Sequence, residues 1–183
     1  MVPFYTRTTP AEWPPFARAP PIAWLLCDHI SQPIKQATYI IKPNGFNIPI
    51  HVAQIHGINN AKAMTEGVNY FDVLRELDNV LIGVNTIVSH NLNFDYNVLQ
   101  AEYYRYEVPS SLQYKKQICT MKASTEFCKL PGKGKYPGSF KWPRLDELYD
   151  VLFHEPLERK HDAREDVLAC AKCFFELKKL GVL

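Results

Sequence analysis

The sequence predicts an α/β fold with a mixed central sheet flanked by helices. Two apolar, β-branched runs separated by a turn come early and indicate neighbouring antiparallel strands. After them, apolar residues recur at helical spacing in several segments, with short β-branched runs between these segments. Strands interleaved with helices are typical of a sheet covered by helices. The expected strands are residues 2–8, 22–27, 38–42, 86–90 and 117–121. The expected helices are residues 51–57, 60–66, 71–81, 91–107, 123–129, 145–152 and 161–180.

Length and composition favour one domain over residues 1–183, because a chain of this size with 46% hydrophobic residues can bury a good core. No apolar run approaches the roughly 20 residues of a membrane span, so no membrane association is expected. The five cysteines are an odd number without a disulfide-framework spacing, which fits a reducing compartment. We therefore expect a cytoplasmic protein. Cys170 and Cys173 share an apolar helix face, which favours a core role over zinc binding.

The last helix carries an acid on its apolar side. Asp162 and Glu165 have the spacing of a capping box, which predicts where this helix begins. Apolar side chains between Ala169 and Leu180 form one face of the helix, and Asp166 lies within that face. A carboxylate that faces a core costs several kcal/mol unless it is protonated, paired or bound to a metal. Asp166 is therefore a candidate functional residue, and His161 is the nearest group with acid–base chemistry.

A second acid repeats this pattern in the helix expected at residues 91–107. Asp95 shares an arc with Val98, Leu99 and Tyr106, so it points at least partly toward the interior. Two aspartates that face the core from separate helices predict a single site.

Positive charge is concentrated in one part of the chain. Residues 115–144 contain eight Lys and Arg residues against one acid, a balance of +7, which leaves −5 for the rest of the chain. Such a stretch indicates a contact surface for phosphates, and a solvated loop is the alternative. His56 and His90 are read first as structural residues, and His56 also as a nucleic-acid contact. The candidate nucleic-acid-binding residues are Lys133, Lys135, Tyr136, Lys141, Trp142 and His56.

Three stretches carry a resemblance to a known family. They are His90-Asn-Leu-Asn-Phe-Asp95, His161-x-x-x-x-Asp166 and, before both, Ile55-His-Gly-Ile58. In this order, at a strand-to-helix junction and on the final helix, they resemble the DEDDh-type 3′–5′ exonucleases, which include the epsilon subunit of DNA polymerase III and ribonuclease T. The resemblance covers nearly the whole chain. It implies a ribonuclease H-like exonuclease fold and single-stranded DNA or RNA as the partner.

The resemblance also implies a mechanism and a role for each site residue. The family binds two divalent metal ions, usually Mg²⁺, with Mn²⁺ as a substitute. The ligands are a first-motif Asp-x-Glu and the third-motif Asp, here Asp166, while the second-motif Asp, here Asp95, supports the site. His161 would take the proton of the attacking water.

The first motif departs from the family pattern. The family has Phe-Asp-x-Glu-Thr-Thr-Gly, whereas this chain has Phe4-Tyr-Thr-Arg-Thr-Thr-Pro10, so Tyr5 and Arg7 stand where the two acids belong. We therefore expect weak or absent metal binding at Asp95 and Asp166, and a catalytically impaired protein that still binds 3′ ends or a protein partner. The alternatives are an active metal-dependent 3′–5′ exonuclease, which would use Mg²⁺ or Mn²⁺, and a non-catalytic protein-interaction domain.

Overall fold

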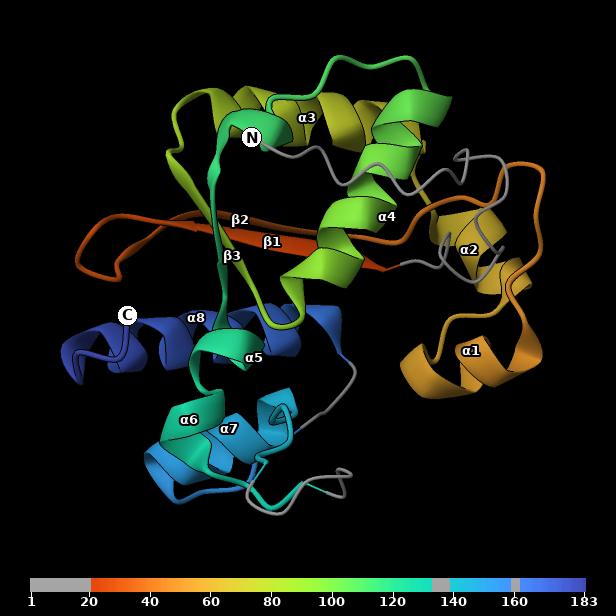
Figure 1. Ribbon diagram of the computed structural model, residues 1–183. Coiled ribbons are helices and arrows are strands. Elements are labelled where there is room, and N and C mark those ends of the chain that lie inside the picture. The colour runs from red at the N-terminus through yellow and green to blue at the C-terminus, as the bar shows by residue number, and fades with distance from the viewer. Residues whose placement is uncertain (1–20, 133–138, 159–161) are drawn as a thin grey trace.

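The computed structural model describes residues 21–132, 139–158 and 162–183, and Figure 1 shows how their elements are arranged. The strands are β1 (Ile22–Cys27), β2 (Pro33–Tyr39), β3 (Thr86–Ser89) and β4 (Lys116–Cys119). The helices are α1 (Ile50–His56), α2 (Asn60–Glu66), α3 (Tyr70–Ile82), α4 (Leu92–Arg105), α5 (Thr120–Ala123), α6 (Thr125–Cys128), α7 (Leu145–Phe153) and α8 (Ala163–Lys179), with a 3₁₀ turn at Leu112–Tyr114. This alternation confirms the predicted α/β fold. The strand expected at residues 2–8 lies outside the described residues.

The first two strands form an antiparallel hairpin, as predicted. Ile22 pairs with Tyr39 and Leu26 with Lys35. The carboxylate of Asp28 closes the turn by accepting hydrogen bonds from the backbone N–H groups of residues 30 and 32, at 2.9 and 2.8 Å. The second strand begins five residues before the expected position, because its exposed first half tolerates polar side chains that hide the strand pattern. It also ends earlier than expected, and Ile41 forms an isolated parallel bridge with Val68.

The other two strands pair in parallel, so both strand directions occur in the described part of the chain. Thr86 faces Lys116 and Ser89 faces Cys119 along this pair. A parallel pair needs a crossover connection, which α4 provides. The strand β4 ends at Cys119 instead of continuing to residue 121, because the chain turns there into α5. No described strand joins the two pairs, but α8 packs against β1, β2 and β3.

The main core lies between the hairpin and helices α3 and α4. Val73, Leu74, Leu77 and Leu81 recur along α3 and are buried together, as their helical spacing predicts. The hydroxyl of Tyr103 in α4 donates a hydrogen bond to the carbonyl of Leu74 at 3.2 Å. Figure 1 shows α3 on one side of β1 and β2 and α8 on the other. These two helices therefore lie against opposite faces of the hairpin, and the first half of β2 stays exposed.

The last helix begins and ends where its capping residues dictate. The carboxylate of Asp162 accepts hydrogen bonds from the N–H groups of Arg164 and Glu165, at 3.0 and 3.4 Å, so the predicted cap is confirmed. Cys173 and Leu177 of the predicted apolar face are fully buried. Leu180, however, is 50% exposed, because the helix ends at residue 179 and Leu180 lies beyond its last turn.

A lysine held between aromatic rings joins α7 to α8. The ammonium nitrogen of Lys172 lies 4.1 Å from the ring centre of Phe153 and 4.7 Å from that of Tyr149. The same nitrogen donates hydrogen bonds to the Tyr149 hydroxyl at 2.6 Å and to a Glu155 carboxylate oxygen at 3.0 Å. Leu148 and Leu177 pack beneath this contact. Among the described helices, none is both long and apolar enough to cross a membrane.

The contact between β2 and α3 makes stability depend on pH. Glu76 accepts hydrogen bonds from Lys35, at 2.8 Å, and from the Tyr39 hydroxyl. Lys35 and then Tyr39 hold the pKa of Glu76 below its usual range, and Glu76 raises the pKa of Tyr39 to about 12. Because the carboxylate is about a third exposed, this contact contributes at most about 1 kcal/mol.

We predict that Glu76→Gln lowers the free energy of unfolding by less than about 1 kcal/mol at pH 7. A carboxyl group with a lowered pKa stabilises the fold above its unfolded pKa, and this contribution is lost as the pH falls. The difference from the parent chain should therefore begin to shrink as the pH falls below the ordinary pKa of glutamate, and it should be smaller at pH 3 than at pH 7. Urea titrations at both pH values measure it, with Glu66→Gln as an exposed control. An equal deficit at pH 3 would contradict the prediction.

Candidate nucleic-acid-binding site

The candidate site lies at the carboxyl ends of β3 and β4. Because these strands are parallel and Ser89 faces Cys119, the residues that follow them emerge at one edge. In open α/β folds this edge is where ligands bind. Asp95 lies in the first turn of α4, directly after β3, and the Ser89 hydroxyl donates a hydrogen bond to its carboxylate. The second-motif acid is therefore fixed at the strand end.

A tight turn at Asn91 connects β3 to α4. Asn91 has a φ of 68°, in the left-handed region that asparagine tolerates better than most residues. Its side chain makes no capping hydrogen bond, so its backbone conformation explains its place here. The turn starts the helix within two residues of the strand end, and Asp95 consequently lies beside Ser89.

Burial governs the electrostatics of Asp95. Removal from water raises the pKa of the Asp95 carboxyl group, and the hydrogen bond from Ser89 partly opposes this effect. The sequence-based expectation that Asp95 faces the interior agrees with this environment. The pKa of the Cys170 thiol in α8 is raised to about 12. Burial of the thiol is the largest cause, and the charge of Asp95 adds to it. Helices α4 and α8 therefore approach each other at this point.

The third-motif acid lies one helical turn before Cys170. Asp166 and Cys170 are four residues apart in α8, so they share a face of the helix. Asp166 is partly buried, and its N–H donates to the carbonyl of Asp162 at 2.9 Å. Cys170 therefore lies near Asp95 and on the same helix face as Asp166, which places both motif acids in one region. A single site that contains Asp95 and Asp166 stays a prediction. His161 lies outside the described residues, as do Tyr5 and Arg7.

A two-metal centre of this family uses four carboxylates, and the described residues supply two of them. Within residues 21–132, 139–158 and 162–183, no group of three or more His, Cys, Asp or Glu residues is arranged to hold a metal ion. Asp95 and Asp166 are only two carboxylates, and Mg²⁺ does not take a protonated thiol such as Cys170 as a ligand. The described residues therefore do not fit a two-metal centre by themselves.

His90 connects three segments at the same edge. One ring nitrogen, Nδ1, lies 3.0 Å from the hydroxyl oxygen of Thr120, the first residue of α5. The other, Nε2, lies 3.0 Å from the carbonyl oxygen of Pro143, shortly before α7. These two contacts agree with the structural interpretation of His90. Sequence reasoning missed Thr120 and Pro143, because partners 30 and 53 residues away leave no local pattern.

The basic stretch is less positive than its own residues suggest. Lys141 forms an ion pair with Glu147, and Arg144 forms one with Asp146 at 3.0 Å. Both acids lie just beyond residue 144, so a charge count that ends there leaves them out. Trp142, by contrast, is 61% exposed. The remaining candidates in this stretch, Lys133, Lys135 and Tyr136, lie outside the described residues.

Lys122, which the sequence analysis did not select, accompanies Trp142. Its ammonium nitrogen lies 5.9 Å from the centre of the Trp142 ring. This distance is within the range of a cation–π contact. An exposed indole beside an exposed ammonium offers a face for a nucleobase and a charge for a phosphate.

His56 lies away from this edge, at the end of α1. Its Nδ1 accepts a hydrogen bond from the N–H of Ile58 at 3.1 Å, around Gly57, whose φ of 73° ends the helix. Burial lowers the pKa of His56. Its role as a nucleic-acid contact stays a prediction, because one ring nitrogen already serves the turn.

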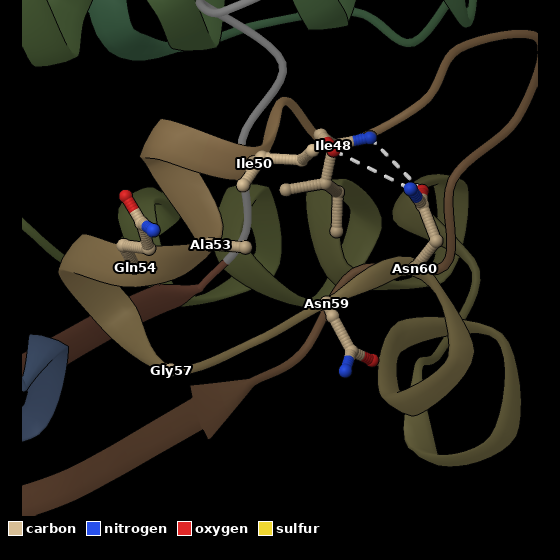
Figure 2. A pocket seen from close by; sticks show the side chains of 7 residues that line it. All are labelled: Ile48, Ile50, Ala53, Gln54, Gly57, Asn59 and Asn60. Atoms are coloured by element: carbon tan, nitrogen blue, oxygen red, sulfur yellow. Dashed lines mark hydrogen bonds between the residues drawn. The ribbon is translucent and has the colours of Figure 1, made fainter.

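Beside this turn, an open hollow of about 310 Å³ lies between α1 and the start of α2. Figure 2 shows the side chains that line it. Asn60 supports the hollow through hydrogen bonds with the backbone N–H and carbonyl of Ile48, at 2.9 and 3.3 Å. The lining residues are Ile48, Ile50, Ala53, Gln54, Gly57, Asn59 and Asn60.

Comparison with known proteins identifies the class. Residues 24–174 match the family model described as RNase_T, exonuclease, and the chain therefore belongs to the DEDDh-type 3′–5′ exonuclease family. The matched region contains Asp95, His161 and Asp166, and it begins after Tyr5 and Arg7. No curated protein matches the chain.

Solved structures of exonuclease I share the fold. An Escherichia coli exonuclease I complex with a 5cy-dA13 oligonucleotide matches with a TM-score of 0.67 and 19% identity, over 87% of this chain and 36% of that chain. A second structure of exonuclease I gives 0.70 and 19%, over 86% and 36%. Exonuclease I from Methylocaldum szegediense gives 0.66 and 20%, over 86% and 36%. The chain spans about a third of these proteins, and the likeness confirms the ribonuclease H-like exonuclease fold.

We predict that Asp95→Asn raises the free energy of unfolding at pH 7 in buffer containing EDTA. A carboxyl group with a raised pKa favours the fold when protonated, and this contribution is lost as the pH rises through the folded pKa. The gain of the variant should therefore disappear below about pH 4, where the parent side chain is also neutral. Urea titrations across this range measure the effect, with Asp150→Asn as an exposed control. A variant less stable at pH 7 would mean that a positive charge holds Asp95 ionised.

Proposed function

We propose that this chain binds the 3′ ends of single-stranded nucleic acid and is catalytically impaired. The observation that carries the proposal is the replacement of both first-motif acids in a chain that keeps the second and third motifs. Tyr5 and Arg7 stand in the first motif, while Asp95 and Asp166 lie on α4 and α8. The scaffold of the family is therefore retained without its full set of carboxylates.

Impairment follows from the chemistry of the two replacements. Divalent Mg²⁺ or Mn²⁺, the cofactor expected of an active member, prefers several hard oxygen ligands. A tyrosine phenol with an ordinary pKa near 10 is neutral at pH 7 and replaces a carboxylate poorly. An arginine at the second position adds a permanent positive charge, which repels a divalent cation. In an active protein, Asp95 and Asp166 would face the metal ions and His161 would accept the proton of water.

Single-stranded DNA is the first ligand to test, and RNA the second. Exonuclease I of Escherichia coli has been solved with dA13-type and dT13 oligonucleotides, and it shares the fold of this chain. Exposed Trp142 and neighbouring Lys122 supply the stacking face and charge that such ligands need. Further proposed contacts are Lys133, Lys135, Tyr136 and Lys141, close to Trp142 in the sequence, and His56, which lies away from this edge. Lys141 would exchange Glu147 for a phosphate.

The wider setting is also a proposal. We propose that residues 1–183 act as one exonuclease-like domain in the cytoplasm. The five cysteines are free thiols, which supports a reducing compartment. A protein partner in place of nucleic acid is the alternative, and it would be favoured by a chain that neither cleaves nor binds oligonucleotides.

We predict that the purified chain degrades a 5′-labelled oligothymidylate slowly or not at all with Mg²⁺ or Mn²⁺. Tyr5→Asp combined with Arg7→Glu should restore cleavage, whereas either single change should not, because the two ligands act as a unit. A denaturing gel of the shortened products measures the rate, and the restored variant carrying Asp166→Ala is the matched control. Strong cleavage by the parent chain that is lost in Asp166→Ala would establish the active alternative.

We predict that the basic and aromatic surface supplies most of the oligonucleotide affinity. Replacing Lys133, Lys135 and Lys141 together by alanine should weaken binding and reduce its salt dependence by roughly one ion for each phosphate that a lysine no longer neutralises. Trp142→Ala should weaken binding by roughly tenfold, since stacking contributes about 1–3 kcal/mol per base. Fluorescence anisotropy at several salt concentrations measures both effects, and Trp142→Phe is the control that keeps a ring. An unchanged salt slope in the triple variant would identify a merely solvated loop.

A further inference from the structure

The indole of Trp142 is exposed, but the backbone beside it is anchored. Trp142 is 61% exposed, whereas the next residue, Pro143, is among the fully buried residues. This stretch precedes the first turn of α7. On its other side, the backbone N–H of Lys141 donates a hydrogen bond to the carbonyl of Leu130 at 3.0 Å, so the Trp142 backbone is held from both neighbours. The carbonyl of Pro143 accepts from Nε2 of His90 at 3.0 Å, and this hydrogen bond ties the segment to the end of β3.

The same imidazole also reaches the helix that carries Lys122. Its Nδ1 lies 3.0 Å from the hydroxyl oxygen of Thr120, which is fully buried and begins α5. Lys122 follows two residues later and lies over the Trp142 ring. The two ring nitrogens of His90 therefore hold the two backbone segments whose side chains form the cation–π pair.

Hydrogen-bond chemistry fixes the orientation of the ring. A carbonyl oxygen only accepts, so Nε2 of His90 carries the hydrogen that is donated to Pro143. Burial lowers the pKa of His90. The hydrogen bond to the Pro143 carbonyl and the charge of nearby Asp146 both act to raise this pKa and so partly offset the effect of burial. The neutral ring then accepts at Nδ1 from the Thr120 hydroxyl at 3.0 Å, and the carbonyl of Ser89 is a second, longer acceptor for that hydroxyl at 3.4 Å. Rotation of the imidazole would break both hydrogen bonds together, so this residue joins the two segments rigidly.

We propose that His90 is a positioning residue that holds Trp142 and Lys122 in place for a nucleobase and its phosphate at the carboxyl edge of β3 and β4. This inference rests on the proposed nucleic-acid-binding function. An aromatic platform fixed before the ligand arrives loses less conformational freedom on binding than a mobile one. His90 thus acts on affinity through Pro143 and Thr120, without touching the nucleic acid.

Two conservative variants separate the two hydrogen bonds of His90. The amide nitrogen of glutamine falls near the position of Nε2, so His90→Gln keeps a donor for the Pro143 carbonyl. The amide oxygen of asparagine falls near Nδ1, so His90→Asn keeps only the acceptor for Thr120. If His90 positions Trp142, the asparagine variant should bind oligothymidylate roughly tenfold more weakly. The glutamine variant should stay within about twofold of the parent chain.

A spectroscopic measurement tests the inference without any ligand. In a chain with Trp13→Phe and Trp24→Phe, Trp142 is the remaining tryptophan. His90→Asn should lower the fluorescence anisotropy of Trp142 and raise its quenching by acrylamide, while His90→Gln should leave both near the values of that parent. In binding, His90→Asn added to Trp142→Ala should cause no further loss, because both changes remove one platform.

The outcomes distinguish this inference from the proposed function. Equal affinities and equal Trp142 anisotropies in the glutamine and asparagine variants would overturn the positioning role, even if Trp142→Ala weakens binding. A parent chain that binds no oligonucleotide would overturn the proposed function, and the Trp142 anisotropy would still report whether His90 fixes the segment. If His90→Asn is poorly folded, the comparison of His90→Gln with His90→Ala replaces it, with loss expected in alanine alone.

Discussion

Parallel pairing of β3 with β4 determines where the candidate functional groups lie. The pairing places Ser89 opposite Cys119, so the chain leaves both strands at one edge and continues into α4 and α5. Asp95 and His90 depend on the first exit and Thr120 on the second. A slip of one residue in this register would exchange the faces of the strand and separate the imidazole of His90 from the hydroxyl of Thr120. Helix α8 packs against β3 and against both strands of the hairpin, so it connects the two strand pairs.

The edge combines groups with opposite energetic demands. An ionised Asp95 is costly there because the surroundings are poor in water, and among the described residues the hydroxyl hydrogen bond from Ser89 partly offsets the cost. His90 meets the same surroundings by staying neutral and using both ring nitrogens. An active site of the DEDDh family would use metal ions to balance its acids. Under the proposed replacement of the first-motif acids by Tyr5 and Arg7, the remaining acids are satisfied in another way, and protonation is one that burial itself favours.

Local patterns in the sequence were sufficient for much of the fold. The spacing of Leu74, Leu77 and Leu81 located α3, and Asp162 located the start of α8, because both signals depend on residues within a turn or two. The strand β2 was placed too late because an exposed edge strand carries polar residues such as Lys35. The boundary between β4 and α5 was missed because a buried threonine, Thr120, suits either a strand or a helix start.

The candidate site was only partly accessible in the same way. An acid on an apolar helix face is visible as a pattern, which is why Asp95 and Asp166 were selected. Pairing across the fold is not visible: the bond from His90 to Pro143 and the approach of Lys122 to Trp142 depend on tertiary packing. The neutralisation of Lys141 by Glu147 shows the converse error, in which a charge count by segment ignores the acids of the following helix.

The buried face of α8 also has a chemical consequence. Burial first of all raises the pKa of the thiols of Cys170 and Cys173 to about 12 in each case. The thiolate is the reactive form, and burial keeps both groups almost entirely as neutral thiols at pH 7. Peroxide and alkylating reagents attack thiolates, so these two sulfur atoms are chemically inert while the fold is intact. Their modification would report that α8 had left its place against the strands, which makes the helix a natural sensor of local opening.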